Sequence, residues 1–293
     1  MHRFKELNKK NVLELIRKAS CELPLDIEKM LISMRAKEDK KSAAYMILGS
    51  ILDNVALARN ISSPICQDTG TLLFYVTKPF DLDSRKLIGV IKKAVLEATN
   101  KSYLRPNTVD PITGTNSGDN LGNGHPYIHF TDWSKKEIEI KLLLKGGGSE
   151  NASIQYKLPD ASLKAGRDLA GVEKVILDSV FKAQGKGCAP GILGVGIGGD
   201  RQTSYQVAKK QLFRSLADKN ENPKLAKLES NIFKKANLLN IGPMGLMGKT
   251  TLLGVKIGCI HRLPACYFVS VAYLCWAARK ASLNITTKGV KYA

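Results

Sequence analysis

Three cysteines lie in settings that could support chemistry. Cys66 precedes Gln67 and Asp68 in the polar stretch SSPICQDTGTL. Cys188 lies in the glycine- and proline-containing stretch GKGCAPG, and Cys275 lies near the end of an apolar run. Thiolates are soft ligands that favour iron–sulfur clusters, zinc or Cu(I). A site with three protein thiolates leaves one metal corner open as a Lewis acid for a carboxylate or hydroxyl. The alternative for each cysteine is a small buried hydrophobic residue.

Other ligand patterns are missing from the sequence. No C-x-x-C pair occurs, so zinc-ribbon and thioredoxin motifs are absent. The chain has only four histidines, which argues against a histidine-rich metal site. Asp68 and Thr69 also have a simpler interpretation, because such residues often form turns and helix caps.

Two glycine-rich stretches resemble nucleotide-binding motifs without matching them. GVGIGG fits G-x-G-x-x-G, but the helix after it leads into a polar loop and another helix instead of a second strand. GPMGLMGKTT has five residues between Gly242 and Gly248, where a P-loop has four. We therefore reject ATP binding at the second stretch, although its backbone N–H groups could still face an anion. Nucleotide binding at these loops remains an alternative that a ligand-induced shift in melting temperature would test.

The composition describes an ordinary globular chain with a basic surface. The 293 residues have a net charge of +19, but the lysines are scattered and not gathered on one helix. A basic nucleic-acid-binding protein is therefore an alternative that the pattern does not favour. No apolar run approaches the ~18 residues of a membrane span, and the N-terminal stretch lacks a signal-peptide pattern. We expect a cytoplasmic protein with reduced cysteines and no membrane association.

The elements that would position these residues alternate between helices and short strands. Apolar spacing predicts helices within residues 4–60 and a strand at 72–77. A loop at 104–126 is long enough to suggest a functional role. The strands predicted at 127–133 and 137–145 would form a hairpin or share a sheet. The remaining predictions are helices at 81–102, 170–187, 203–216 and 223–239, a strand within 188–201, a glycine-rich loop and strand over 240–258, and a strand or helix at 264–281. We predict a mixed α/β fold, with small sheets flanked by helices, in a single domain over residues 1–293.

Six segments together resemble one enzyme family. They are PICQDTG, LRPN with the following DP and DN, KGGGSEN, GKGCAPGILGVGIGGDR, NIGPMGLMGKTTLLGVKI and HRLPACYFVSVAYLCWAARK. This set is similar to the α subunit, or N-terminal half, of class I iron–sulfur hydro-lyases, which include fumarate hydratases and L-tartrate dehydratases. The resemblance extends over about residues 10–282.

The resemblance implies a [4Fe–4S] cluster held by Cys66, Cys188 and Cys275. Cys259 and Cys266 match no ligand of the family and keep the structural interpretation. The fourth iron would then be left to a dicarboxylate substrate and would stabilise negative charge that develops on it.

The resemblance also implies roles for the residues around the cluster. Gln67 would hydrogen-bond the substrate, and Asp68 would orient or transfer the hydroxyl proton. Arg105 would hold the distal carboxylate through its planar guanidinium, although it could equally be a surface residue. Gly147, in the triple glycine, would let the backbone approach the substrate. His261 is a candidate substrate-binding residue, although the family pattern places a histidine immediately before Pro264, where this chain has leucine.

The implied activity is the reversible hydration of fumarate to L-malate, a reaction of the tricarboxylic acid cycle. The alternative within the family is the dehydration of L-tartrate or of a related 2-hydroxy-dicarboxylate. The resemblance further implies a separate β subunit that completes the active site, in an α2β2 heterotetramer.

Overall fold

The computed structural model describes residues 4–293, and its contacts gather into two compact units. Unit 1 contains the described residues up to Pro24, together with Asp53–Gly146 and Arg279–Ala293. Unit 2 contains Leu25–Leu52 and Gly147–Ala278. The expected mixed α/β class is confirmed, because two small mixed sheets are flanked by helices. A single domain over residues 1–293 stays a prediction.

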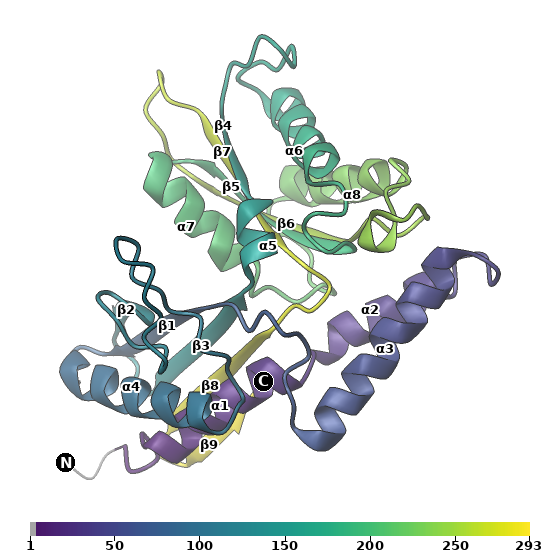
Figure 1. The fold of residues 1–293 in the computed structure, drawn as a ribbon. Helices are drawn as coiled ribbons and strands as arrows, with labels where there is room; N and C mark the ends of the chain where they lie inside the picture. Colours follow the sequence, from purple (N-terminus) through teal and green to yellow (C-terminus); the bar gives the residue numbers. More distant parts are fainter. Residues whose placement is uncertain (1–3) are drawn as a thin grey trace. The chain divides into compact units, whose positions relative to one another are not determined.

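Unit 1 is built on a five-stranded sheet that packs against two helices (Figure 1). The strand order is β2 (Tyr127–Trp133), β1 (Thr71–Pro79), β3 (Ile138–Lys145), β8 (Lys280–Thr286) and β9 (Gly289–Tyr292). Helix α1 (Lys9–Cys21) packs against α4 (Ser84–Asn100) and against β3 and β8. Apolar residues of both helices and of the central strands form one buried core.

The helices of unit 1 begin where their sequences provide caps. The Asp83 side chain accepts a hydrogen bond from the backbone N–H of Arg85 and so starts α4, as Asn8 does for α1. The two strands predicted at 127–133 and 137–145 do not pair with each other. Strand β1 lies between them, parallel to β2 and antiparallel to β3.

Unit 2 contains a four-stranded sheet with helices around it (Figure 1). The order is β4 (Ile154–Lys157), β7 (Phe268–Leu274), β5 (Gly191–Gly198) and β6 (Leu252–Ile260). The ambiguous segment 264–281 therefore forms strands, β7 and the start of β8. The helices are α2 (Leu25–Arg35), α5 (Gly147–Asn151), α6 (Leu169–Ala183), α7 (Arg201–Gln211) and α8 (Pro223–Asn237), with a 3-10 turn η1 (Pro243–Gly245). Helix α3 (Ala43–Ile61) contributes residues to both units.

The two glycine motifs have packing roles in unit 2. Gly194 and Gly196 lie within β5, where a Cβ would come within 2.2 Å of the Ala208 carbonyl oxygen and 2.1 Å of the Ser204 carbonyl oxygen, respectively. These glycines therefore let α7 approach the sheet closely. In the GKTT stretch, the Glu38 carboxylate accepts hydrogen bonds from the Lys249 N–H at 3.1 Å and the Thr250 hydroxyl at 2.6 Å. The anion that faces this loop is thus an internal carboxylate.

No helix within residues 4–293 combines the length and the apolar character that crossing a membrane requires.

Candidate active site

The residues predicted to form the site belong to both units. Cys66, Gln67, Asp68 and Arg105 lie in unit 1, whereas Gly147, Cys188, His261 and Cys275 lie in unit 2. The two groups are described separately below.

The Cys66 loop of unit 1 leads directly into β1. Cys66 and Asp68 are half-buried, and Gln67 between them is exposed. Asp68 Oδ1 accepts a hydrogen bond from the Gly70 N–H at 3.0 Å, which closes a tight turn. The φ of Gly70 is +77°, and a Cβ there would lie 2.7 Å from the carbonyl carbon of Lys145. The turn that carries Cys66 is therefore packed onto the end of β3.

The other side of Asp68 faces the first glycine of KGGGSEN and a buried arginine. A Cβ on Gly146 would lie 2.8 Å from Asp68 Oδ2 and 3.0 Å from Arg279 Nη2. Arg279 Nη1 donates a hydrogen bond to the main-chain carbonyl of Asp68. The carboxylate that was predicted to handle a proton thus lies in a corner with a guanidinium, where only glycine leaves room.

A network of polar residues positions the backbone of Arg105. The sequence predicted a role for Arg105 but did not predict this network. The buried Thr69 hydroxyl accepts hydrogen bonds from the Arg105 N–H and from Asn107 Nδ2, both at 3.0 Å. Asn120, also buried, accepts from the Asn107 N–H at 2.8 Å and donates to the Arg105 carbonyl at 2.9 Å. The polar residues of LRPN and DN are the sequence signal for this network. It fixes the Arg105 backbone beside the Cys66 loop and leaves its side chain exposed.

In unit 2, the structure brings the segments of Cys188 and Cys275 together. The Trp276 N–H donates to the Cys188 carbonyl at 3.4 Å. The Cys275 N–H donates to the hydroxyl of Ser149 at 3.2 Å, and Ser149 belongs to the GGGSEN turn that forms α5. Cys188 is half-buried with a φ of +52°, and Cys275 is buried. Three of the segments singled out in the sequence therefore meet in one unit.

Tyr273 is buried against the glycines that flank Cys188 and lies two residues before Cys275. Burial raises the pKa of its phenol, and the charges of Cys275 and Cys188 raise that pKa further. A Cβ on Gly187 would lie 2.5 Å from the Tyr273 ring, and one on Gly191 would lie 2.3 Å from it. The glycines around Cys188 thus make space for an aromatic ring. The glycines are visible in the sequence, but their packing against the ring of Tyr273 could not be predicted from it.

The two substrate-binding candidates of unit 2 lie at its surface. Gly147 is the first residue of α5 and is exposed. His261 is exposed and follows β6, with its carbonyl accepting the Gly199 N–H at 3.3 Å. The loop after it is held by Arg262, whose Nη1 donates to the carbonyls of Leu263 and Pro264, each at 2.9 Å.

The cysteines suit an iron–sulfur cluster by their chemistry. Within residues 4–293, no three histidine, cysteine or carboxylate side chains gather closely enough to hold a single metal ion. A four-iron cluster binds each thiolate to a different iron, so its ligand sulfurs need not surround one point. None of the six cysteines, each among the described residues, forms a disulfide. Cys188 and Cys275 together supply soft donors in one unit, which fits the predicted group.

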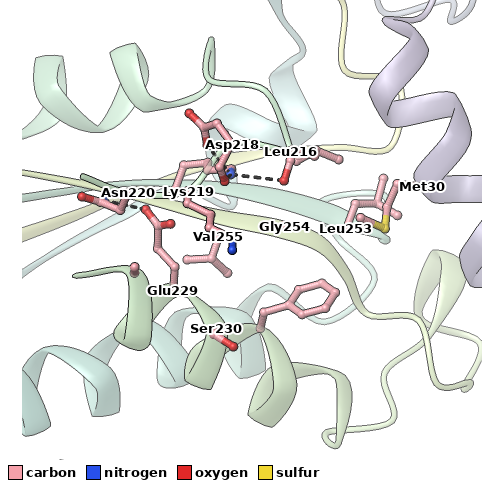
Figure 2. A pocket seen from close by; sticks show the side chains of 13 residues that line it. Met30, Leu216, Asp218, Lys219, Asn220, Glu229, Ser230, Leu253, Gly254 and Val255 are labelled. Atoms are coloured by element: carbon pink, nitrogen blue, oxygen red, sulfur yellow. Dashed lines mark hydrogen bonds and ion pairs between the residues drawn. The ribbon is translucent and has the colours of Figure 1, made fainter. Parts of the chain in front are cut away.

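A separate pocket of about 380 Å³ lies in unit 2 and contains none of the predicted site residues (Figure 2). Three of its charged residues, Asp218, Glu229 and Lys256, make polar contacts with other protein groups. Lys256 Nζ donates to Asp218 Oδ1 at 2.5 Å and to the carbonyls of Asp218 and Leu216 at 2.8 and 3.2 Å. Glu229 Oε1 accepts from Asn220 Nδ2 at 2.9 Å and from the Ile257 N–H at 2.7 Å. We interpret the contacts of Asp218, Glu229 and Lys256 as a structural network that lines this pocket, because each of these charged groups is bound by other protein groups.

Comparison with known proteins gives the family. A family model described as fumarate hydratase (Fumerase) matches residues 9–284. A Geobacillus stearothermophilus protein named "Putative fumarate hydratase class I" is 47% identical over 278 residues, which are 94% of this chain and 54% of that protein. The L(+)-tartrate dehydratase subunit alpha of Escherichia coli K12 is 32% identical over 274 residues, 91% of this chain and 86% of that subunit.

The chain therefore belongs to the fumarate hydratase (Fumerase) family, a family of lyases, as the sequence motifs indicated. It spans about half the length of the Geobacillus relative and most of the length of the Escherichia subunit.

Proposed function

We propose that this chain is the cluster-bearing α subunit of a class I fumarate hydratase, which hydrates fumarate reversibly to L-malate. The observation that supports this most strongly is the meeting of the Cys188 and Cys275 segments beside Tyr273, within a chain of this family. Higher identity to the relative named for fumarate than to the subunit named for tartrate favours fumarate as the substrate.

The proposed ligands of a [4Fe–4S] cluster are Cys66, Cys188 and Cys275. When bound, the cluster would supply a Lewis acid that polarises a substrate carboxylate or hydroxyl. Residues of this chain would bind the substrate and transfer its proton. Asp68 would hold or transfer the hydroxyl proton from its corner beside Gly146, and the exposed amide of Gln67 would hydrogen-bond the substrate.

Three further residues would bind the dianionic substrate. Arg105 has a fixed backbone and an exposed guanidinium, which suits bidentate contact with a carboxylate. Gly147 and His261 are exposed in unit 2, where the glycine would let a substrate approach the backbone closely and the imidazole would donate a hydrogen bond.

The active enzyme would include a second chain. The relative from Escherichia is called a subunit alpha, and this chain matches only about half of the Geobacillus protein. We propose a separate β subunit and an α2β2 heterotetramer. The cytoplasm is the proposed compartment, because six cysteines without a disulfide among them suit a reducing environment.

The direct test is anaerobic co-expression with a candidate β chain, followed by measurement of fumarate and L-tartrate turnover side by side. We expect about four irons per chain and faster turnover of fumarate. Faster turnover of L-tartrate would assign the alternative substrate. No turnover of either dicarboxylate by an iron-loaded complex would reject the activity.

The ligand assignment has its own test. Cys66→Ser, Cys188→Ser and Cys275→Ser should each abolish cluster incorporation, measured as iron and sulfide per chain and as visible absorbance. Cys259→Ser is the matched control, because Cys259 is exposed and outside the proposed ligand set. Equal iron loss in all four variants would contradict the assignment.

A further inference from the structure

Arg279 is the largest side chain that the described structure buries almost completely, with 1% of its surface exposed. Its main-chain carbonyl accepts the Leu144 N–H at 2.9 Å, just before β8 begins. Within residues 4–293, its Nε is the one buried side-chain nitrogen or oxygen without a hydrogen-bond partner. A guanidinium remains charged at all ordinary pH values, and burying one with an unused donor costs free energy.

The guanidinium meets the Cys66 loop at Asp68. Nη1 donates to the Asp68 carbonyl, and Nη2 faces the same point above Gly146 as the Asp68 carboxylate does. The contact joins residues 211 positions apart in the sequence. Asp68 Oδ1 is already engaged by the Gly70 N–H. Two contacts therefore fix the turn from Cys66 to Gly70. One is the internal hydrogen bond from the Gly70 N–H to Asp68, and the other is the hydrogen bond that Arg279 donates to the Asp68 carbonyl.

We propose that Arg279 is a positioning residue that fixes the Cys66 loop and aims the carboxylate of Asp68. The inference rests on the proposed function, because it assigns Asp68 a proton-handling role. It explains why a charged residue occupies a buried position that an apolar side chain could fill. A residue chosen only for packing would not leave a donor unused, whereas a residue that orders an active-site turn can be retained despite that cost.

The first test uses the metal-free full chain, so it does not depend on activity. In Arg279→Met, the Cys66 loop loses its external hydrogen bond and should open more often. We expect the rate of Cys66 alkylation by iodoacetamide, followed by mass spectrometry, to rise about tenfold. Cys259, exposed in unit 2, is the internal control and should keep its rate. An unchanged Cys66 rate would overturn the proposal.

The second test uses the anaerobic complex with its β chain. Arg279→Met should lower kcat about 100-fold, since misplacing a proton-transfer group by about 1 Å has effects of this order. KM and iron content should stay within threefold of the wild type. Arg279→Lys, which keeps a charged donor, should recover at least part of the loss. Arg85→Met, on the exposed surface of the same unit, is the matched arginine control and should leave kcat unchanged.

In this second test, three results would overturn the proposal. They are a kcat within threefold of the wild type, a rise in KM without a fall in kcat, and a loss of iron in proportion to activity. Failure of the proposed function would give a different result, because the wild-type complex would then turn over neither dicarboxylate. The alkylation test would still show whether Arg279 holds the Cys66 loop, since it needs no activity.

Discussion

Lys256 and Arg279 are buried basic side chains that each lie beside an aspartate, and they differ in how fully their hydrogen-bond donors are used. Lys256 in unit 2 is 4% exposed, and its ammonium group has three acceptors, all on Leu216 and Asp218. Arg279 in unit 1 is 1% exposed, and its Nε has no partner in the part of the chain that the structure describes. An ammonium has three donors, so Lys256 is satisfied completely. The difference suggests that Lys256 stabilises the fold and that Arg279 is retained for its position beside Asp68 in the proposed active site.

The largest stability effect should come from breaking the paired network. Glu229 Oε1 accepts hydrogen bonds from Arg214 at 2.8 Å, from Asn220 and from the Ile257 N–H. Glu229→Ala removes all three acceptor contacts and leaves a partly buried guanidinium without that partner. We expect a loss of about 3 kcal/mol in the free energy of unfolding, measured by urea denaturation of the whole chain.

The control for this variant is Glu221→Ala. Glu221 is an exposed carboxylate in the loop that leads to α8, and its removal should cost less than about 0.5 kcal/mol. If the two variants lose equal stability, the network around the pocket is not structural.

The comparison is sharpest when both basic residues are changed in the same way. Lys256→Met should lower the free energy of unfolding by about 2 kcal/mol, because Asp218 loses its buried partner. Arg279→Met should change it by less than about 1 kcal/mol, since removing an unpaired buried donor offsets the lost hydrogen bond to Asp68. Parallel urea denaturation of both variants measures this. Equal losses would mean that Arg279 is as structural as Lys256.

In both regions, the sequence allowed better prediction of individual helices, strands and turns than of the strand pairings and tertiary contacts between them. The fold class and most elements followed from apolar spacing, because each helix or strand needs only its own pattern. The rejection of nucleotide binding at the two glycine motifs stays a prediction, since it rests only on the spacing around Gly242 and on the elements that follow GVGIGG. The position of β1 between β2 and β3 was not predicted. Strands β1 and β2 pair in parallel, and a parallel pair has no short hairpin turn that could be recognised in the sequence.

The site illustrates the same limit. Cys66, Gln67 and Asp68 were singled out by their residue types, but the partner that holds their turn lies 211 residues beyond Asp68. In the sequence, Arg279 is one of several basic residues near an apolar run, and nothing local marks it as buried. Its role depends on β8 pairing with β3, which places it against the Cys66 loop. Tertiary pairing of this kind cannot be derived from one sequence.

The smallest expected effect is a pH dependence of the paired network. Burial alone would raise the pKa of Asp218, but the hydrogen bonds and charges of Arg214 and Lys256 lower it overall. Since the folded-state pKa lies below the ordinary value of 3.8, this pairing stabilises the protein at pH values above about 4. The stabilisation is lost as the pH falls through the folded-state pKa.

Asp218→Asn tests this, because it removes the titrating group and keeps the side chain's shape. The free energy of unfolding of the wild type should exceed that of the variant at pH 6, and the gap should narrow below pH 4. The gap should stay small, since the Asp218 side chain is 37% exposed and solvent screens its charge. A gap that is constant across this range would show that the carboxylate's ionisation is not linked to folding. The network would then be held by hydrogen-bond geometry instead of charge.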